Sequence, residues 1–348
     1  MRWDNIYLAG TGSYLPEQVQ TAEQAVAEGL ADADEVAAHG IRAVRVATPD
    51  ETGPVMAAHA GRRAVERSGL STEDFGLLIH SYVLHQGQEM WTPASYVQHE
   101  TIGGTAPAVE VLQNSSGGLF SLEMAASHLA ARPQPGAVLI TTGDQHRLPY
   151  FDRWNSDDAL AHGDGAGALV LSNQEGFARL LATVSYGDPS LEPFLRGTRG
   201  WTPAPFAEGR PIDLRGRIRD FMAQGEANLD IMGERIGSMS VRVLEDALKE
   251  AGTDLRSARF FVHPNINRAT VEFAYHDALG VNPDTTTYEW ARDLGHMGAG
   301  DHLISLDHVV AERGPRKGDL LIAMGATAGF VWTVAVLEFL VDLPARTA

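Results

Sequence analysis

The chain has 348 residues, of which 44% are hydrophobic and 21% are charged, and its formal net charge at pH 7 is -18. These values are typical of a globular protein with one large or two medium domains, and the acidic excess disfavours nucleic acid as a partner, because neutralising phosphates requires a basic surface. The chain contains no cysteine, which excludes disulfides, thiolate metal sites and a cysteine nucleophile.

The N-terminal segment, MRWDNIYLAGTG, lacks the basic, apolar and small-residue order of a signal peptide, and no stretch of the sequence has the apolar length of a membrane span. We therefore expect a cytoplasmic protein with no membrane partner. GTGSYL follows a predicted strand but lacks the third glycine of a dinucleotide-binding loop, so nicotinamide binding is not expected.

The next elements alternate between helix and strand. MAAHAGRRAVERSG predicts a helix that stops at Gly69, and FGLLIHSY predicts a buried strand after it. In VEVLQNSSGGLFSLEMA an alternating apolar run halts at Ser115 and Ser116 and restarts as a helical pattern. The first N-H groups of a helix lack partners and carry the positive end of its dipole, so this junction suits either a plain serine cap or a nucleophile whose intermediate becomes negative.

Two further buried strands are predicted before the middle of the chain. PGAVLITTGD forms one, and HGDGAGALVLSNQEG leads from Gly163 into an apolar β-like run rather than into a helix. ARLLATVSYGD then opens a new strand after a polar turn. We place a domain boundary at Asn173, which gives an N-terminal half at 1–173 and a C-terminal half at 174–348.

The segment SLEPFLRGTRGWTPAPFAEGR is rich in proline, glycine and aromatic residues, so we expect a long structured loop or lid rather than a regular element between Ser190 and Arg210. DLRGRIRDF follows and carries a small basic cluster of Arg215, Arg217 and Arg219 in an otherwise acidic chain. The cluster fits either a docking patch for an acidic partner or a solvated basic face.

The second half repeats the turns of the first. MSVRVLEDALKEAG stops at Gly252 before the strand ARFFVHP, and KGDLLIAMGA repeats PGAVLITTGD at nearly the same offset. Buried runs such as AVLITT and DLLIAM, separated by helices of a dozen or more residues, are typical of parallel strands covered on both faces. The sequence therefore predicts an α/β fold made of two βαβ-rich halves of similar topology.

The repeat relates the Ser115 junction to the turn in GHMGAGDHLISLDH that carries His296. Equivalent helix starts of a duplicated fold can meet at its centre, so we expect the Ser115 hydroxyl and the His296 imidazole to face each other. His263 ends the strand in FFVHPNINR, where open α/β sheets gather catalytic groups. The spacing of His296, Asp301 and His302 fits none of the usual zinc patterns, so no metal site is expected.

Six segments, spread in order from Ile6 to about Leu340, resemble landmarks of the ketoacyl synthase III branch of the thiolase fold. They are GTGSYLPE, GIRAVRVATPDET, NSSGGLFSLEMA, HGDGAGA, HPNIN and GATAGFVW. The resemblance implies two pseudo-duplicated halves in a five-layered αβαβα arrangement. In that family a cysteine is acylated by a thioester of coenzyme A or a carrier protein, and a His and an Asn promote decarboxylation of a malonyl group. The family cysteine falls on Ser115, the His on His263 and the Asn on His296.

The departures from the family at Ser115 and His296 are chemically consistent with each other. A serine hydroxyl is far less acidic than a thiol and needs a general base within hydrogen-bond reach, which His296 would supply with Asp301 orienting its other nitrogen. The resemblance assigns His263 as an oxyanion donor or an alternative base. It assigns the backbone N-H groups of Ser115 and Ala328 to the oxyanion hole.

Loss of the family Asn removes part of the apparatus that stabilises a malonyl-derived enolate. We therefore expect an acyltransferase that acylates itself on Ser115 and passes the acyl group to an acceptor in polyketide or antibiotic biosynthesis, without obligatory condensation. Two alternatives stay open. One is a starter-unit ketosynthase that condenses the acyl group with malonyl carrier protein, using His263 and His296 together. The other is an inactive thiolase-fold partner subunit.

The acyl donor is either an acyl carrier protein or acyl coenzyme A, and each brings its own phosphopantetheine, so no separate cofactor is expected. The family Trp and Arg that pack against the adenine of coenzyme A fall on Asp34 and Ala38, which favours the carrier protein. Docking of that acidic partner would use Arg215, Arg217 and Arg219, which lie near the tunnel mouth in the family.

The segment HQGQEMWTPAS matches a family loop that carries an aromatic residue across a twofold interface. The resemblance therefore implies a homodimer in which Trp91 closes the acyl pocket of the partner.

Overall fold

The computed structural model describes residues 1–132, 134, 136–223 and 229–345. Within these residues one mixed nine-stranded sheet runs in the order β5-β4-β6-β7-β1-β8-β11-β10-β9, and β2 pairs with β3 in a separate ribbon. The strands are β1 (Tyr7–Tyr14), β2 (Val19–Thr21), β3 (Ala43–Arg45), β4 (Phe75–Ser81), β5 (Ala108–Val111), β6 (Ala137–Thr142), β7 (Ala166–Ser172), β8 (Ala178–Gly187), β9 (Ala258–Val262), β10 (Leu320–Thr327) and β11 (Val331–Phe339).

The two halves of the sheet repeat one pairing pattern. In the first half β4 is parallel to β6, which is antiparallel to β7, which is antiparallel to β1. In the second half β9 is parallel to β10, which is antiparallel to β11, which is antiparallel to β8. A short antiparallel contact between β1 and β8 joins the halves. The predicted α/β fold of two similar halves is thus confirmed.

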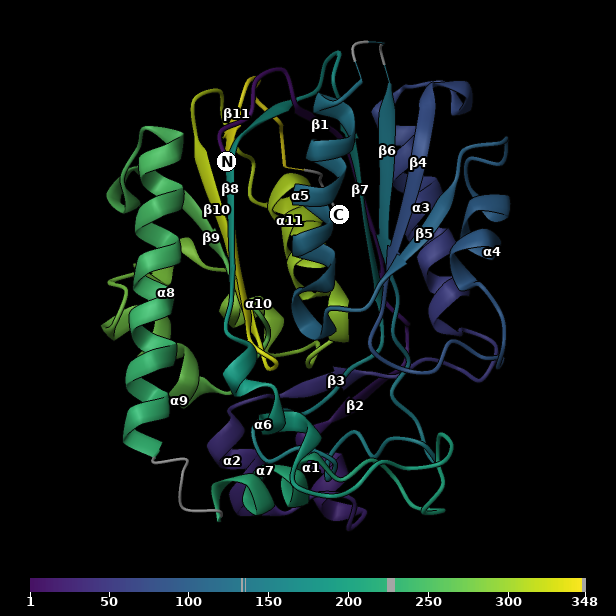
Figure 1. Cartoon of the computed structure of the whole chain (residues 1–348), viewed down its shortest axis with the longest axis vertical. Coiled ribbons are helices and arrows are strands. Elements are labelled where there is room, and N and C mark those ends of the chain that lie inside the picture. The colour runs from purple at the N-terminus through teal and green to yellow at the C-terminus, as the bar shows by residue number, and fades with distance from the viewer. Residues whose placement is uncertain (133, 135, 224–228, 346–348) are drawn as a thin grey trace.

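Helices complete five layers (Figure 1). The helices α5 (Gly117–Ala130) and α11 (Asp301–Glu312) lie between the two halves of the sheet. The outer face of the first half is covered by α3 (Gly53–Ser68) and α4 (Pro93–Glu100), and that of the second by α8 (Leu229–Ala251). The five-layered thiolase arrangement is therefore confirmed as well.

Local sequence explains where these helices end. α3 ends before Gly69 and α8 ends before Gly252, and both glycines adopt the left-handed conformation, with φ of 67° and 69°. Glycine adopts this conformation without the steric cost that a Cβ brings, so both helices stop where the sequence predicts. The central helices are largely buried because they face sheet on both sides. Leu119 and Leu122 of α5 pack in one core cluster with Leu303 of α11.

The remaining helices are short. Most of them gather with β2 and β3 beside one end of the sheet (Figure 1). They are α1 (Ala22–Ala27), α2 (Ala33–His39), α6 (Pro193–Arg196), α7 (Leu214–Met222), α9 (Arg268–Thr270) and α10 (Tyr288–Ala291). The expectation that the segment 190–210 holds no regular element is wrong at its start, because α6 forms one helical turn there, with Pro193 at a position that suits proline.

Asn173 lies in the turn that joins β7 to β8, and its side chain accepts a hydrogen bond from the N-H of Gly136. The boundary placed there stays a prediction, because the halves share one sheet and a core between them. Of the helices that the structure describes, none is long and apolar enough to cross a lipid bilayer.

Candidate active site

Ser115 lies where the chain passes from β5 into α5. A short 3-10 turn, Asn114–Ser116, directly precedes α5. Asn114 has a left-handed backbone, with φ of 42°. Ser116 holds the N-cap position of α5, but its hydroxyl makes no capping hydrogen bond, and the Ser115 hydroxyl is bonded to His296 instead. The interpretation of this pair as plain helix caps is therefore wrong.

The two glycines after Ser116 let this helix start pack tightly against its neighbours. A Cβ on Gly117 would lie 2.0 Å from Ser81 Oγ on β4, and one on Gly118 would lie 2.6 Å from the carbonyl oxygen of Ala299. Neither position has room for a side chain. The Ser-Ser-Gly-Gly sequence thus brings the start of α5 against the turn that leads into α11.

That turn carries the partners of Ser115. The Ser115 Oγ lies 2.7 Å from Nε2 of His296, and Nδ1 of His296 lies 2.6 Å from Oδ2 of Asp301. Asp301 also accepts hydrogen bonds from the backbone N-H groups of Met297, at 2.8 Å, and Asn265, at 2.7 Å. The structure therefore joins Ser115, His296 and Asp301 in one hydrogen-bonded chain.

The charges of His296 and Asp301 support each other. Burial by itself lowers the pKa of His296, but the Asp301 carboxylate, together with the charges of Asp157 and Asp144, outweighs burial and raises that pKa above its ordinary value. Burial raises the pKa of Asp301, whereas the His296 charge and the bonds from Met297 and Asn265 lower it, and the net shift is downward. Asp301 is thus an anion that accepts Nδ1-H, which leaves the Nε2 lone pair of His296 free to accept the Ser115 proton.

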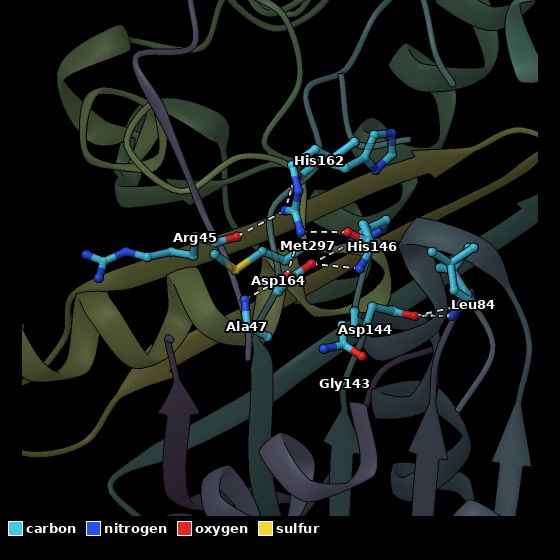
Figure 2. A network of polar contacts seen from close by, with 12 residues as sticks. Arg45, Ala47, Leu84, Gly143, Asp144, His146, His162, Asp164 and Met297 are labelled. Carbon is cyan, nitrogen blue, oxygen red and sulfur yellow. Dashed lines mark hydrogen bonds and ion pairs between the residues drawn. The ribbon is translucent and has the colours of Figure 1, made fainter. Parts of the chain in front are cut away.

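Two buried carboxylates, Asp144 and Asp164, hold the loops around the hydrogen-bonded series Ser115, His296 and Asp301 (Figure 2). Asp144 accepts hydrogen bonds from the N-H groups of Val83, at 2.8 Å, and Leu84, at 3.0 Å, on one oxygen, and from Ala299, at 3.0 Å, on the other. It thereby fixes the turn between His296 and Asp301.

The second carboxylate, Asp164, accepts bonds from the N-H groups of Ala47 and His146 and from the Arg153 guanidinium. Burial raises the pKa of Asp164, but its partners His146 and Arg153 lower it by more than burial raises it. The net pKa lies below its ordinary value, so the side chain is held as an anion. Asp164 follows Gly163, whose N-H donates to the His296 carbonyl at 3.0 Å. The HGDGAGA segment therefore braces the backbone of His296.

Ser115 and His296 open onto a pocket of about 580 Å³, a volume suited to a small-molecule group. Its wall is mostly apolar and includes Phe151, Leu160, Phe194, Ile212, Leu214 and Ile218. Ala328 lines the same pocket, and its carbonyl accepts a hydrogen bond from the Asn114 side chain at 3.2 Å. The predicted oxyanion donor thus lies beside the nucleophile loop, and its role stays a prediction.

His263 lies outside this hydrogen-bonded chain. Its Nδ1-H donates to the Pro264 carbonyl at 2.8 Å, its ring stacks on Tyr275 at 4.7 Å, and burial lowers its pKa to about 4. Within the described residues its Nε2 has no hydrogen-bond partner. A neutral ring that donates through Nδ1 carries a lone pair on Nε2, so in this state it cannot donate a hydrogen bond to an oxyanion.

The three arginines expected at a docking surface have different surroundings. Arg215 forms a two-pronged ion pair with Glu35, with both N-O distances at 2.8 Å, and a further ion pair with Asp158. Arg217 lines the pocket, and Arg219 is exposed. Arg215 therefore braces α7 against α2, and the docking prediction now depends on Arg217 and Arg219.

Trp91 is 39% exposed and packs edge-on against Tyr96, with ring centroids 5.8 Å apart. It is absent from the lining of the pocket of its own chain. Whether it reaches the pocket of a second chain stays a prediction.

Sequence reasoning missed three buried titratable side chains that line the pocket, His146, Asp157 and His162. His162 directly precedes Gly163 in the HGDGAGA motif, and its ring lies 5.2 Å from that of His296. Its place at the start of the HGDGAGA motif, a family landmark, could have marked His162 as a candidate site residue.

Comparisons with family models and with known sequences point to one family. Residues 109–189 match the family described as 3-oxoacyl-[acyl-carrier-protein (ACP)] synthase III, and residues 248–339 match its C-terminal region. The β-ketoacyl-[acyl-carrier-protein] synthase III of Rhizorhabdus wittichii is 27% identical over 334 residues, which cover 95% of this chain and 98% of that protein.

Solved structures are similar over nearly the whole chain. The acyltransferase ChlB3 is 35% identical with a TM-score of 0.91, and the match covers 98% of this chain and 99% of ChlB3. The priming β-ketosynthase of the R1128 polyketide pathway is 20% identical with a TM-score of 0.77, over 99% of this chain and 98% of that chain. At this lower identity the second likeness shows the fold alone.

Proposed function

This chain belongs to the ketoacyl-[acyl-carrier-protein] synthase III-like family of the thiolase superfamily, and on that premise we propose that it is an acyltransferase which uses Ser115 as its nucleophile. The observation that carries the proposal is the chain of 2.7 Å and 2.6 Å contacts from Ser115 through His296 to Asp301. A base at this distance makes a serine hydroxyl reactive, and the acidic partner keeps the base in the correct tautomer.

The proposed reaction has two steps. His296 Nε2 takes the proton of Ser115 as Oγ attacks the thioester carbonyl carbon, and the thiol leaves with that proton. An acceptor hydroxyl or amine then gives its proton to His296 as it attacks the Ser115 ester, and His296 passes that proton to the departing Ser115 Oγ, which releases the acylated acceptor and restores Ser115. The N-H groups of Ser115 and Ala328 would stabilise the oxyanion in both steps.

Acyl transfer fits the site better than decarboxylative condensation. His296 stands where the family has the asparagine that assists decarboxylation. His263 is a neutral ring whose Nδ1-H donates to the Pro264 carbonyl. The likeness to ChlB3, a protein described as an acyltransferase, supports the same choice. The starter-unit ketosynthase remains the alternative. It requires a carbon-carbon bond to form when malonyl carrier protein is added to the acyl-enzyme.

The test is the mass of the intact protein after incubation with butyryl and octanoyl thioesters of a carrier protein and of N-acetylcysteamine. We expect the mass to increase by one acyl group and peptide mapping to place that group on Ser115. Ser115→Ala should abolish the adduct, and Ser116→Ala, which alters the neighbouring buried hydroxyl, should retain it. Acylation on Ser116, or undiminished acylation of Ser115→Ala, would contradict the proposal.

We further propose an acyl carrier protein as the donor. Asp34 and Ala38, which replace the family residues that hold adenine, are both exposed on α2 and offer no aromatic surface for a nucleotide. Arg219 is exposed on α7, and Arg217 on the same helix lines the pocket. These two cations would meet the acidic surface of a carrier protein.

Arg219→Glu tests this docking surface by reversing one exposed charge. We expect KM for acyl carrier protein to rise about tenfold, because loss of one charge pair and added repulsion cost roughly 1.4 kcal/mol at such a surface. The rate with acyl N-acetylcysteamine, which lacks the carrier protein, should not change. Arg256→Glu, which reverses an exposed charge in the 3-10 turn just before β9, is the matched control. Equal effects of the two variants would exclude Arg219 as a docking residue.

A further inference from the structure

The pocket contains a second polar pair that the proposed reaction does not use. His162 and Asp157 are only 6% and 7% exposed, and both line the pocket beside Ser115 and His296. The His162 Nε2 lies 4.0 Å from the Asp157 Oδ2, which is beyond hydrogen-bond reach. Within the described residues neither ring nitrogen of His162 has a hydrogen-bond partner, and no contact drawn in Figure 2 reaches its ring.

The backbone groups of His162 have hydrogen-bond partners in the fold, whereas its imidazole nitrogens have none among the residues that the structure describes. Its N-H donates to the Arg153 carbonyl at 2.9 Å, and its own carbonyl accepts from the Arg153 side chain at 3.0 Å. The ring lies edge-on to Phe151 at 4.7 Å and to His296 at 5.2 Å. A phenyl ring would fill this aromatic setting equally well. Buried nitrogens without partners cost free energy, so a ligand that bonds to the Nε2 facing Asp157 would recover part of that cost.

The protonation of the pair is suited to a neutral ligand. Burial, together with the nearby His146 and His296, holds the pKa of His162 well below its ordinary value, so the ring is neutral and has one donor and one acceptor. Burial raises the pKa of Asp157, although its carboxylate accepts the Ala159 N-H at 2.8 Å, so a further donor would stabilise the anion. No group of three ligating side chains among the described residues is arranged to hold a metal ion.

We propose that His162 and Asp157 form a hydroxyl-binding subsite in the acyl-transfer pocket. One hydroxyl oxygen about 2.8 Å from each partner fits the 4.0 Å gap. It accepts the N-H of His162 and donates its own proton to the Asp157 carboxylate. The hydroxyl belongs either to the transferred acyl group or to the acceptor. The subsite depends on the proposed function for the kind of substrate, but not on chemistry at Ser115.

The first arm of the test measures binding without catalysis. In a Ser115→Ala background, 3-hydroxybutyryl-N-acetylcysteamine is compared with butyryl-N-acetylcysteamine by calorimetry. If the hydroxyl belongs to the acyl group, the hydroxylated ester should bind about tenfold more tightly, which is the effect of one or two hydrogen bonds to a buried polar pair. His162→Phe should abolish this preference, and His162→Gln, which keeps an N-H donor, should retain part of it.

The second arm tests the acceptor. The butyryl-enzyme is discharged by 1,3-propanediol or by 1-propanol, and a preference for the diol that His162→Phe removes assigns the subsite to the acceptor. Asp157→Asn should weaken either preference. Phe151→Leu, which changes the apolar neighbour of the His162 ring, is the control and should affect both members of each pair equally.

The outcomes separate the two proposals. If no acyl-enzyme forms, the proposed function fails and the binding arm alone decides the subsite. The subsite is overturned if neither arm shows a preference for the hydroxylated compound, or if the preference survives in a His162→Phe protein whose thermal unfolding matches that of the parent.

Discussion

Serine and cysteine need different partners at the start of a buried helix. A thiol there ionises readily, because the positive end of the helix dipole favours the thiolate, whereas a hydroxyl keeps its proton until a base removes it. In this chain the His296 imidazole, our proposed base, lies 2.7 Å from the Ser115 hydroxyl, at the position where the family resemblance places an asparagine. The exchanges at Ser115 and His296 are therefore best read as one coupled change.

The coupling predicts the outcome of restoring the family residue. His296→Asn should slow self-acylation by about 10²- to 10⁴-fold, because an amide cannot take the serine proton. Adding Ser115→Cys to His296→Asn should restore much of the rate, since a thiol at a helix start depends less on that base. Stopped incubations read by intact mass give both rates. Full-rate acylation by His296→Asn together with loss in His263→Ala would identify His263 as the base.

Asp301 provides a graded control for His296. Asp301→Asn should cost less than His296→Asn, because Asp301 only orients and stabilises the imidazolium. The base must be neutral, so the acylation rate of the parent should rise with pH through the raised pKa of His296. Removing the carboxylate that raises this pKa should move the midpoint of the profile to lower pH. An unchanged midpoint would argue against His296 as the titrating group.

Helices and strands are the most predictable parts of this molecule. The stops at Gly69 and Gly252 and the strands beside them follow from local pattern, and the spacing of the repeat is enough to relate the Ser115 and His296 turns. Asp157 and His162 lie in the segment between β6 and β7. This segment has no helix or strand periodicity from which the direction of a side chain could be predicted. The pairing of Arg215 with Glu35 joins segments 180 residues apart, so only the folded chain reveals it. Local sequence predicts elements, and tertiary contacts decide the use of single side chains.

The turn that carries His296 and Asp301 has no room for a side chain at Gly298. Gly298 has φ of 56°, and a Cβ there would lie 2.2 Å from the Asp144 Oδ2 that holds Ala299. Gly298→Ala should therefore lower both the free energy of unfolding and the rate of acylation. Gly280→Ala is a matched control, because Gly280 has φ of 70° but open space around it, so it should cost only about 1–2 kcal/mol of backbone strain.

Denaturant unfolding and acylation rates distinguish the two glycine variants. The close approach to Asp144 is supported if Gly298→Ala loses clearly more stability than Gly280→Ala and also loses activity. Equal losses of stability, with acylation intact in both variants, would show that the turn tolerates a displaced Asp144.

The whole molecule combines a candidate active site between its halves with a β5 strand that, among the described residues, pairs on one side only. The chemistry lies where α5 and α11 meet, so it needs both halves of the chain. β5 ends the sheet on the side of the first half, and an unpaired edge is a place where chains associate. Val109 on β5 and Leu112 directly after it are exposed apolar side chains. Met90 and Trp91 are also exposed, and they lie in the segment just before α4, the helix that packs on β5. With a net charge of -18 per chain, two copies repel each other at long range, so a stable contact would need such an apolar surface.

We accordingly predict a homodimer that uses the β5 edge and in which Trp91 closes the acyl pocket of the partner. Light scattering should give twice the mass of one chain, and Val109→Lys, which adds a charge to the edge strand, should give monomers. Trp91→Ala should keep the dimer but alter the acyl chain lengths accepted by Ser115, because removing an indole enlarges a pocket. Trp201→Ala changes an indole that is 89% exposed elsewhere and should alter neither property. A parent protein that is monomeric would refute the dimer. An unchanged acyl preference in Trp91→Ala would refute only the role of Trp91, since the edge contact does not require it.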